Sequence, residues 1–317
     1  MINTPVKQRL RSNRQLSPGL QFLIFTCIFI GIFIVFNIIG FAIASAVYGT
    51  DTINQIRLLN LSAPHVVRAL WLMQLVGTTL SVFVAPVFYA YVIANEPVAY
   101  LKPRFSFSWQ MMLLIFVIMF VSNPLIEFLS NLNQQIPLPK WLSWMKENEE
   151  SDRKVMDAFL HMKNVWDVIV DVLAIGLLTA IVEEFMFRGV MLTIFTRWTK
   201  STHAAVWITA IMFSAFHMEF FGFLPRLLLG AFMGYFVAWS GSIWTGVWAH
   251  FVNNATIVVV TYLYQIKVIK TDPDNQHVFN GWQYVVALVI TLALMILYHR
   301  WALKKAPEPD YDGEELD

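Results

Sequence analysis

Two adjacent glutamates, Glu183 and Glu184, stand inside an apolar stretch that runs from Ile169 to Thr196. An ionised side chain at the centre of a bilayer costs about 3 kcal/mol on insertion scales. Arg188 follows Glu184 by four residues, the spacing at which two side chains share one face of a helix. Because intramembrane ionisable residues usually face the bundle interior or a water-filled cavity, we expect a functional site here.

Two later apolar segments add three more polar residues. His217 lies near the end of one, and His250 and Asn254 lie four residues apart in another. A helix rises about 1.5 Å per residue, so Glu183 and these three residues can meet at one level within a membrane. The sequence therefore predicts one site built from three helices.

The residue types indicate hydrolysis. A carboxylate and an imidazole that face one cavity can position a water molecule and accept its proton. A second histidine and an amide side chain can donate hydrogen bonds to the oxyanion that forms when water attacks a carbonyl group. Together they would hydrolyse an amide bond without a covalent intermediate.

The composition supports a membrane protein, since 57% of the residues are hydrophobic and only 14% are charged. Backbone polar groups must be satisfied within lipid, which favours an all-α fold. We expect a polytopic bundle of about eight transmembrane helices, because a span needs about 20 mostly apolar residues. The segments are Leu20–Tyr48, Leu70–Ala94, Trp109–Leu129, Ile169–Thr196, Ala204–Gly222, Leu224–Ser240, Ile243–Tyr264 and Trp282–Trp301.

Basic residues near the segment ends predict the orientation. The N-terminal tail contains four basic residues and no acid, so we expect both termini in the cytoplasm and the first segment as an uncleaved anchor. The basic residues of the tail are Lys7, Arg9, Arg11 and Arg14. The basic residues expected on the same, cytoplasmic side are Lys102, Arg104, Arg197, Lys200, Arg300, Lys304 and Lys305. Those expected on the opposite side are Arg57, Arg226, Lys267 and Lys270. Short loops favour a prokaryotic cytoplasmic membrane.

We divide the chain into five regions. A polar stretch after Trp141 and Trp144 predicts an amphipathic helix along the membrane interface, with substrate gating as an alternative role. The regions are a basic tail (1–19), N-terminal transmembrane helices with a polar interfacial segment at 131–166 (20–168), a catalytic core (169–264), a final loop and helix (265–301) and an acidic tail (302–317).

Two features of the sequence argue against disulfide-rich, cysteine–metal and nucleic-acid-binding proteins. The single cysteine, Cys27, allows no disulfide framework and no cysteine-rich metal site. The net charge of +1 argues against nucleic acid as a partner. The apolar segments instead predict contact with the lipid bilayer.

Three runs carry a resemblance to a known family. They are Glu183-Glu184-Phe-Met-Phe-Arg188, Phe213-Ser-Ala-Phe-His217 and His250-Phe-Val-Asn-Asn254. They resemble the motifs of the CAAX prenyl protease and bacteriocin-processing (CPBP) family of glutamate-type intramembrane proteases. The resemblance covers roughly 169–261, while the first half of the chain matches only as generic membrane helices.

The resemblance implies a role for each motif residue. Glu183 and His217 would activate the water, and His250 and Asn254 would hold the oxyanion. No cofactor is implied, and the substrate would be a membrane-anchored peptide or protein that could be prenylated or not.

The first motif also implies two supporting residues. Glu184 would support the site, and Arg188 would pair with a glutamate. Spacing favours Glu184 as the partner of Arg188, which leaves Glu183 free for the water. Spacing also favours Asn254 over Asn253 as the amide of the site, and we expect Phe213 to serve packing.

Other interpretations of the same residues stay open. Glu184 and Arg188 could form only a structural ion pair, and Glu183, His217 and His250 could bind zinc together with a water. The fold could also serve as a non-catalytic membrane scaffold or a bacteriocin self-immunity protein. A proton-coupled transporter is disfavoured, because the ionisable residues gather in the second half of the chain.

Overall fold

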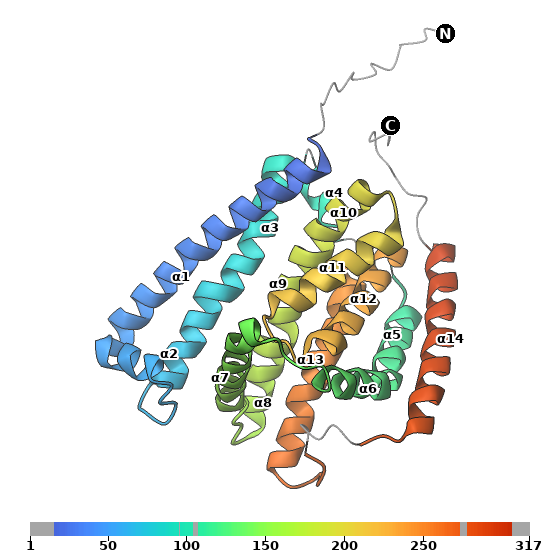
Figure 1. Ribbon diagram of the computed structural model, residues 1–317. Coiled ribbons are helices and arrows are strands. Elements are labelled where there is room, and N and C mark those ends of the chain that lie inside the picture. The colour runs from blue at the N-terminus through green and yellow to red at the C-terminus, as the bar shows by residue number, and fades with distance from the viewer. Residues whose placement is uncertain (1–15, 95, 104–106, 273–277, 306–317) are drawn as a thin grey trace.

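The computed structural model describes residues 16–94, 96–103, 107–272 and 278–305, and every regular element in these ranges is a helix. The predicted all-α class is therefore confirmed. The beginning of α1 and the end of α14 lie at the same end of the bundle (Figure 1). The basic tail residues from Lys7 to Arg14, Arg104 and the acidic stretch from Glu308 to Asp317 lie outside the described residues. The five regional boundaries stay predictions.

Six continuous helical runs in the described part of the chain are long and apolar enough to cross a membrane. They are α1 (Pro18–Arg57); α2, η1 and α3 (Val66–Met73, Gln74–Thr79, Leu80–Ile93); the run Val165–Thr199; α12 (Phe223–Ser240); α13 (Ile243–Gln265); and α14 (Gly281–Lys305). The fold is thus a polytopic membrane bundle, as predicted.

The other two predicted spans are less regular. The segment predicted as one span from Trp109 bends by 41° between α5 (Trp109–Val121) and α6 (Asn123–Gln134), and counting this pair as one span gives seven. Pro124 lies in the first turn of α6, where its ring breaks the hydrogen bonding from the preceding helix. The eighth, α11 (Thr202–Phe216), is apolar but has only 15 residues.

Because of the bend, α6 does not continue in the direction of α5. The helix lies across the end of the bundle opposite to the start of α1 (Figure 1) and packs against α12 and α14. Shorter elements are α4 (Pro97–Tyr100) and η2 (Lys140–Leu142). The polar segment around 131–166 contains the helix expected there, α7 (Ser143–Phe159), in which no side chain is fully buried.

The run that carries the two glutamates is not a uniform helix. It comprises α8 (Val165–Asp171), the π-helical turn η3 (Val172–Leu178), α9 (Thr179–Glu184), the π-helical turn η4 (Phe185–Met191) and α10 (Leu192–Thr199). π-Helical turns widen the backbone locally and are frequent at functional sites. Glu183 and Glu184 thus lie directly between two such turns.

Small residues allow α11 and α12 to pack closely. A side chain built on Gly234 would place its Cβ 3.0 Å from Val206 Cγ1, and one on Gly230 would place it 3.2 Å from Ala210 Cα. Glycines four residues apart are a frequent means of close helix packing in membranes. This packing fixes α11, which ends next to His217, against α12.

We expect Gly234→Leu to destabilise the protein by about 1–3 kcal/mol, because the larger side chain overpacks the contact with Val206. Thermal unfolding in detergent measures the effect. Gly31→Leu is the matched control, since a Cβ at Gly31 has no neighbouring atom within 4 Å. Equal unfolding temperatures for the two variants would contradict this account of the α11–α12 contact.

Candidate functional site

An ion pair between Glu184 and Arg188 lies at the centre of the bundle. Glu184 Oε1 is 2.7 Å from Arg188 Nη1, and both side chains are 0% exposed. Arg188 Nη2 donates a second hydrogen bond to the carbonyl oxygen of Gly230 on α12, at 2.8 Å. The pairing expected from the four-residue spacing is therefore present, and it joins the Val165–Thr199 run to α12.

His250 on α13 joins the same network. Its Nδ1 lies 3.1 Å from Glu184 Oε1, and its Nε2 lies 3.9 Å from Glu183 Oε2. An ionised carboxylate only accepts hydrogen bonds, so Nδ1 carries a proton and donates a hydrogen bond to Glu184. This bond fixes the orientation of the ring and turns Nε2 toward Glu183.

Glu183 differs from its neighbour in exposure. Its side chain is 15% exposed, against 0% for Glu184. Among the described residues its Oε2 has no hydrogen-bond partner, and the same is true of Glu184 Oε2. Glu184 Oε2, however, lies against α13, where a Cβ on Gly246 would approach it to 2.5 Å. Of the two carboxylates, only Glu183 is partly accessible to water.

Phe213 on α11 contacts three members of the site. Its ring centre lies 5.0 Å from that of His217, 5.8 Å from that of His250 and 4.8 Å from Arg188 Cζ. The side chain is only 3% exposed. Phe213 is a packing residue, and its ring is the contact that links His217 to the buried network.

His217 follows the last residue of α11, where it caps the helix. Its Nδ1 lies 2.9 Å from the carbonyl oxygen of Phe213. A carbonyl only accepts, so Nδ1 carries the proton and Nε2 of the neutral ring has a free lone pair. The side chain is partly exposed, which leaves this nitrogen available as a base.

Asn254 lies one turn beyond His250 on α13, but its amide is engaged elsewhere. Its Nδ2 donates to the carbonyl oxygen of Ile175 in η3 at 3.2 Å, and its Oδ1 accepts from Asn253 Nδ2 at 3.1 Å. The structure thus brings Glu183, Glu184, Arg188 and His250 together, with His217 joined through Phe213. Asn254 instead ties α13 to the π-helical turn.

Three contributions to the site were not foreseen from the residue pattern. Gly230 supplies the carbonyl oxygen for Arg188, Gly246 leaves the space beside Glu184, and Glu184 holds His250. The two glycines stand in apolar runs near the motifs, and their small size was the available signal.

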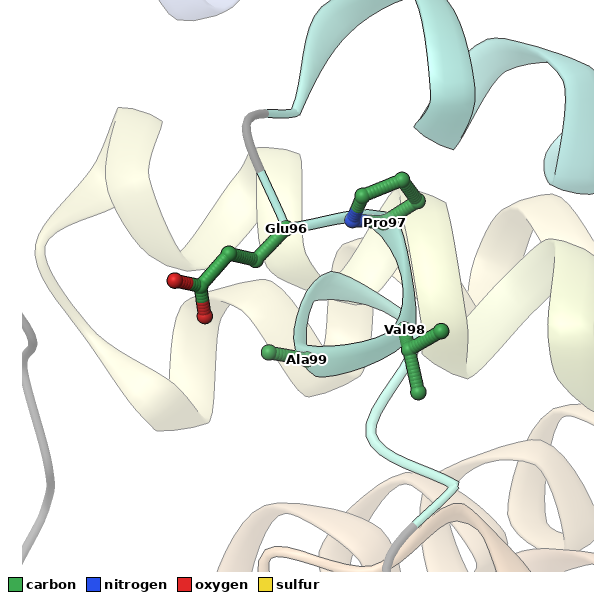
Figure 2. Close-up of a pocket in the computed structure, with 4 residues that line it drawn as sticks. All are labelled: Glu96, Pro97, Val98 and Ala99. Atoms are coloured by element: carbon green, nitrogen blue, oxygen red, sulfur yellow. The ribbon is translucent and has the colours of Figure 1, made fainter.

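Two further observations concern ligands. A hollow of about 420 Å³ lies beside α4 and is lined by Glu96, Pro97, Val98 and Ala99 (Figure 2), none of them a candidate site residue. Within the described ranges, no group of three or more His, Cys, Asp and Glu side chains is arranged to hold a metal ion.

These features define a polytopic helical membrane protein with a buried glutamate–arginine–histidine network. Residues 165–256 match the family model described as type II CAAX prenyl endopeptidase Rce1-like, so the chain contains an Rce1-like segment. This match includes every candidate site residue and confirms the resemblance drawn from the three motifs. The chain is thus an integral membrane protein related to a family of proteases.

One curated protein is similar to part of the chain. The chain is 25% identical over 111 residues to the uncharacterized protein YpbD of Bacillus subtilis (strain 168), an alignment that covers 34% of this chain and 52% of that protein. The chain thus spans about half the length of this relative. No solved structure matches the chain.

We expect Arg188→Ala to lower stability by about 3–5 kcal/mol, because it leaves the carboxylate of Glu184 buried without its cation. Arg188→Lys keeps a positive charge but loses the forked geometry, so it should be less harmful. Thermal unfolding in detergent ranks the variants. An Arg188→Ala variant as stable as the wild type would contradict the structural importance of the pair.

Proposed function

We propose that the protein is an intramembrane endopeptidase that hydrolyses a peptide bond of a membrane-anchored substrate with an activated water. The observation that carries the proposal is the environment of Glu183, whose Oε2 is buried, lacks a donor among the described residues and belongs to a side chain that is 15% exposed. Buried acceptors normally have a partner, and a water molecule is the simplest donor for one on a partly exposed side chain.

The same water can reach a second group. His250 Nε2 lies 3.9 Å from Glu183 Oε2, too far for a direct hydrogen bond. One water can lie about 2.8 Å from two atoms so spaced. Glu183 then accepts the proton of this water as a general base, with His217 Nε2 as the second acceptor that the resemblance assigns to this step.

The bond changes follow from this arrangement. The water oxygen attacks the peptide carbonyl carbon, and its proton passes to Glu183. The carbon–nitrogen bond then breaks, and the leaving amine receives the proton. His250 and Asn254 would donate hydrogen bonds to the oxyanion. Because Nδ1 of His250 is bonded to Glu184, this role requires that Nε2 of the ring also carry a proton. Since the amide of Asn254 is bonded to Ile175 in the structure, this role requires that the amide turn toward the substrate.

The substrate class is part of the proposal. The family description names a prenyl endopeptidase, so a prenylated C-terminal peptide is the first substrate to test. A leader peptide or another membrane protein would use the same residues. The prokaryotic cytoplasmic membrane and the cytoplasmic position of both termini also stay predictions.

Cleavage of a small panel of membrane-anchored peptides, prenylated and unprenylated, tests this function. We expect the purified wild type to cleave at least one peptide and Glu183→Gln to lose at least about 100-fold in turnover, because the amide cannot accept the proton of the water. Glu150→Gln, on the exposed surface of α7, is the matched control. Equal cleavage by the wild type and Glu183→Gln would contradict the role of Glu183; cleavage by none would favour the non-catalytic scaffold.

We also propose that the reaction needs no metal. Purified wild type should contain less than stoichiometric zinc, and a chelator should leave the cleavage rate unchanged. The measurements are metal analysis and turnover before and after chelation. Loss of activity that added zinc restores would replace the metal-free mechanism by the zinc alternative.

A further inference from the structure

The loop between α11 and α12 begins with His217 and continues to Gly222. His217 caps α11, and Met218 after it has a left-handed backbone conformation with φ of 54°. The backbone N–H groups of His217 and Met218 still donate to carbonyl oxygens of α11, at 3.3 and 3.0 Å, and His217 Nδ1 bonds to the Phe213 carbonyl. The rest of the loop, residues 219–222, takes its position from contacts with other helices, and these contacts fix how the chain leaves His217.

Asn133 of α6 supplies two of those contacts. Its Nδ2 donates to the carbonyl oxygen of Phe220 at 2.8 Å, and its Oδ1 accepts from the backbone N–H of Leu224 at 2.6 Å. The side chain is only 2% exposed. Leu224 lies in the first turn of α12, where N–H groups have no partner within the helix. One buried amide therefore joins the loop to the beginning of α12.

A second contact comes from α7. Glu149 Oε2 accepts a hydrogen bond from the backbone N–H of Phe221 at 3.2 Å. Within the loop region, Glu219 and Arg226 form an ion pair, and Ser214 Oγ donates to the carbonyl oxygen of Phe223 at 2.6 Å. The loop after His217 is thus held from its outer side by α6 and α7.

We propose that Asn133 is a positioning residue that fixes His217 for the reaction, with Glu149 as a second anchor. The inference rests on the proposed function, because it concerns His217, the second proton acceptor of that reaction. Neither residue belongs to the segment 165–256 that matches the Rce1-like family model. The first half of this chain therefore takes part in shaping the site.

Asn133 matters for the reaction because catalysis tolerates little displacement of a catalytic side chain. A shift of about 1 Å in a catalytic group can reduce the rate about 100-fold. Loss of the amide of Asn133 releases both the carbonyl of Phe220, three residues after His217, and the start of α12. The substrate contacts would stay, so turnover should fall while the KM value changes little.

The test compares Asn133→Ala and Asn133→Asp with the wild type. Asn123→Ala is the matched control, because the amide of Asn123 is exposed and bonds only to carbonyl groups of α5. Asn133→Asp keeps the acceptor for Leu224 and loses the donor to Phe220, so it tests the loop contact even if the alanine variant does not fold. Amide hydrogen exchange and cleavage kinetics are measured on each full-length protein, with Glu183→Gln in parallel.

We expect the Leu224 amide to exchange at least about tenfold faster in Asn133→Ala, because its acceptor is removed. We also expect kcat to fall about 10- to 100-fold in both Asn133 variants, with KM within about twofold of the wild type. Asn123→Ala should match the wild type in every readout.

Two results would overturn the inference without touching the proposed function. One is a wild-type kcat in both Asn133 variants while Glu183→Gln is inactive. The other is wild-type exchange of Leu224 in Asn133→Ala. If the wild type and Glu183→Gln cleave equally, the proposed function itself fails, and the positioning role fails with it.

Discussion

The buried ion pair of Glu184 and Arg188 is the constraint on which the site depends. Two fully buried charges are stable only when good geometry and further hydrogen bonds compensate for the lost hydration. Arg188 therefore needs the carbonyl oxygen of Gly230 on α12, and Glu184 needs the ring of His250 on α13. Satisfying one pair of charges thus fixes three membrane helices relative to one another.

This constraint explains how two adjacent glutamates can differ in role. Successive residues on a helix point about 100° apart, so Glu184 faces α12 and α13 while Glu183 faces the partly accessible side. The buried network also orients His250, whose second ring nitrogen lies beside Glu183. One carboxylate belongs to the buried network, and in the proposed function the other holds a water.

Local spacing predicted the Glu184–Arg188 contact, since it depends on a single helix. The all-α membrane fold also followed from the apolar segments, and the three motifs carried the resemblance to the protease family. Long-range contacts could not be predicted this way. The hydrogen bonds from Asn254 to Ile175 and from Asn133 to Phe220 join residues far apart in the sequence. These bonds, and the bend after α5, depend on how the helices pack. The spacing of regular helices also could not predict the π-helical turns beside α9.

The central claim is that the two glutamates divide stability and chemistry between them. The most direct measurement compares Glu184→Gln with Glu183→Gln for thermal unfolding and turnover in the same preparations. The account predicts that Glu184→Gln lowers the unfolding temperature, because it leaves Arg188 buried without a counter-ion. Glu183→Gln should unfold like the wild type and yet be inactive. Equal stability of the two variants, or activity retained in Glu183→Gln, would contradict it.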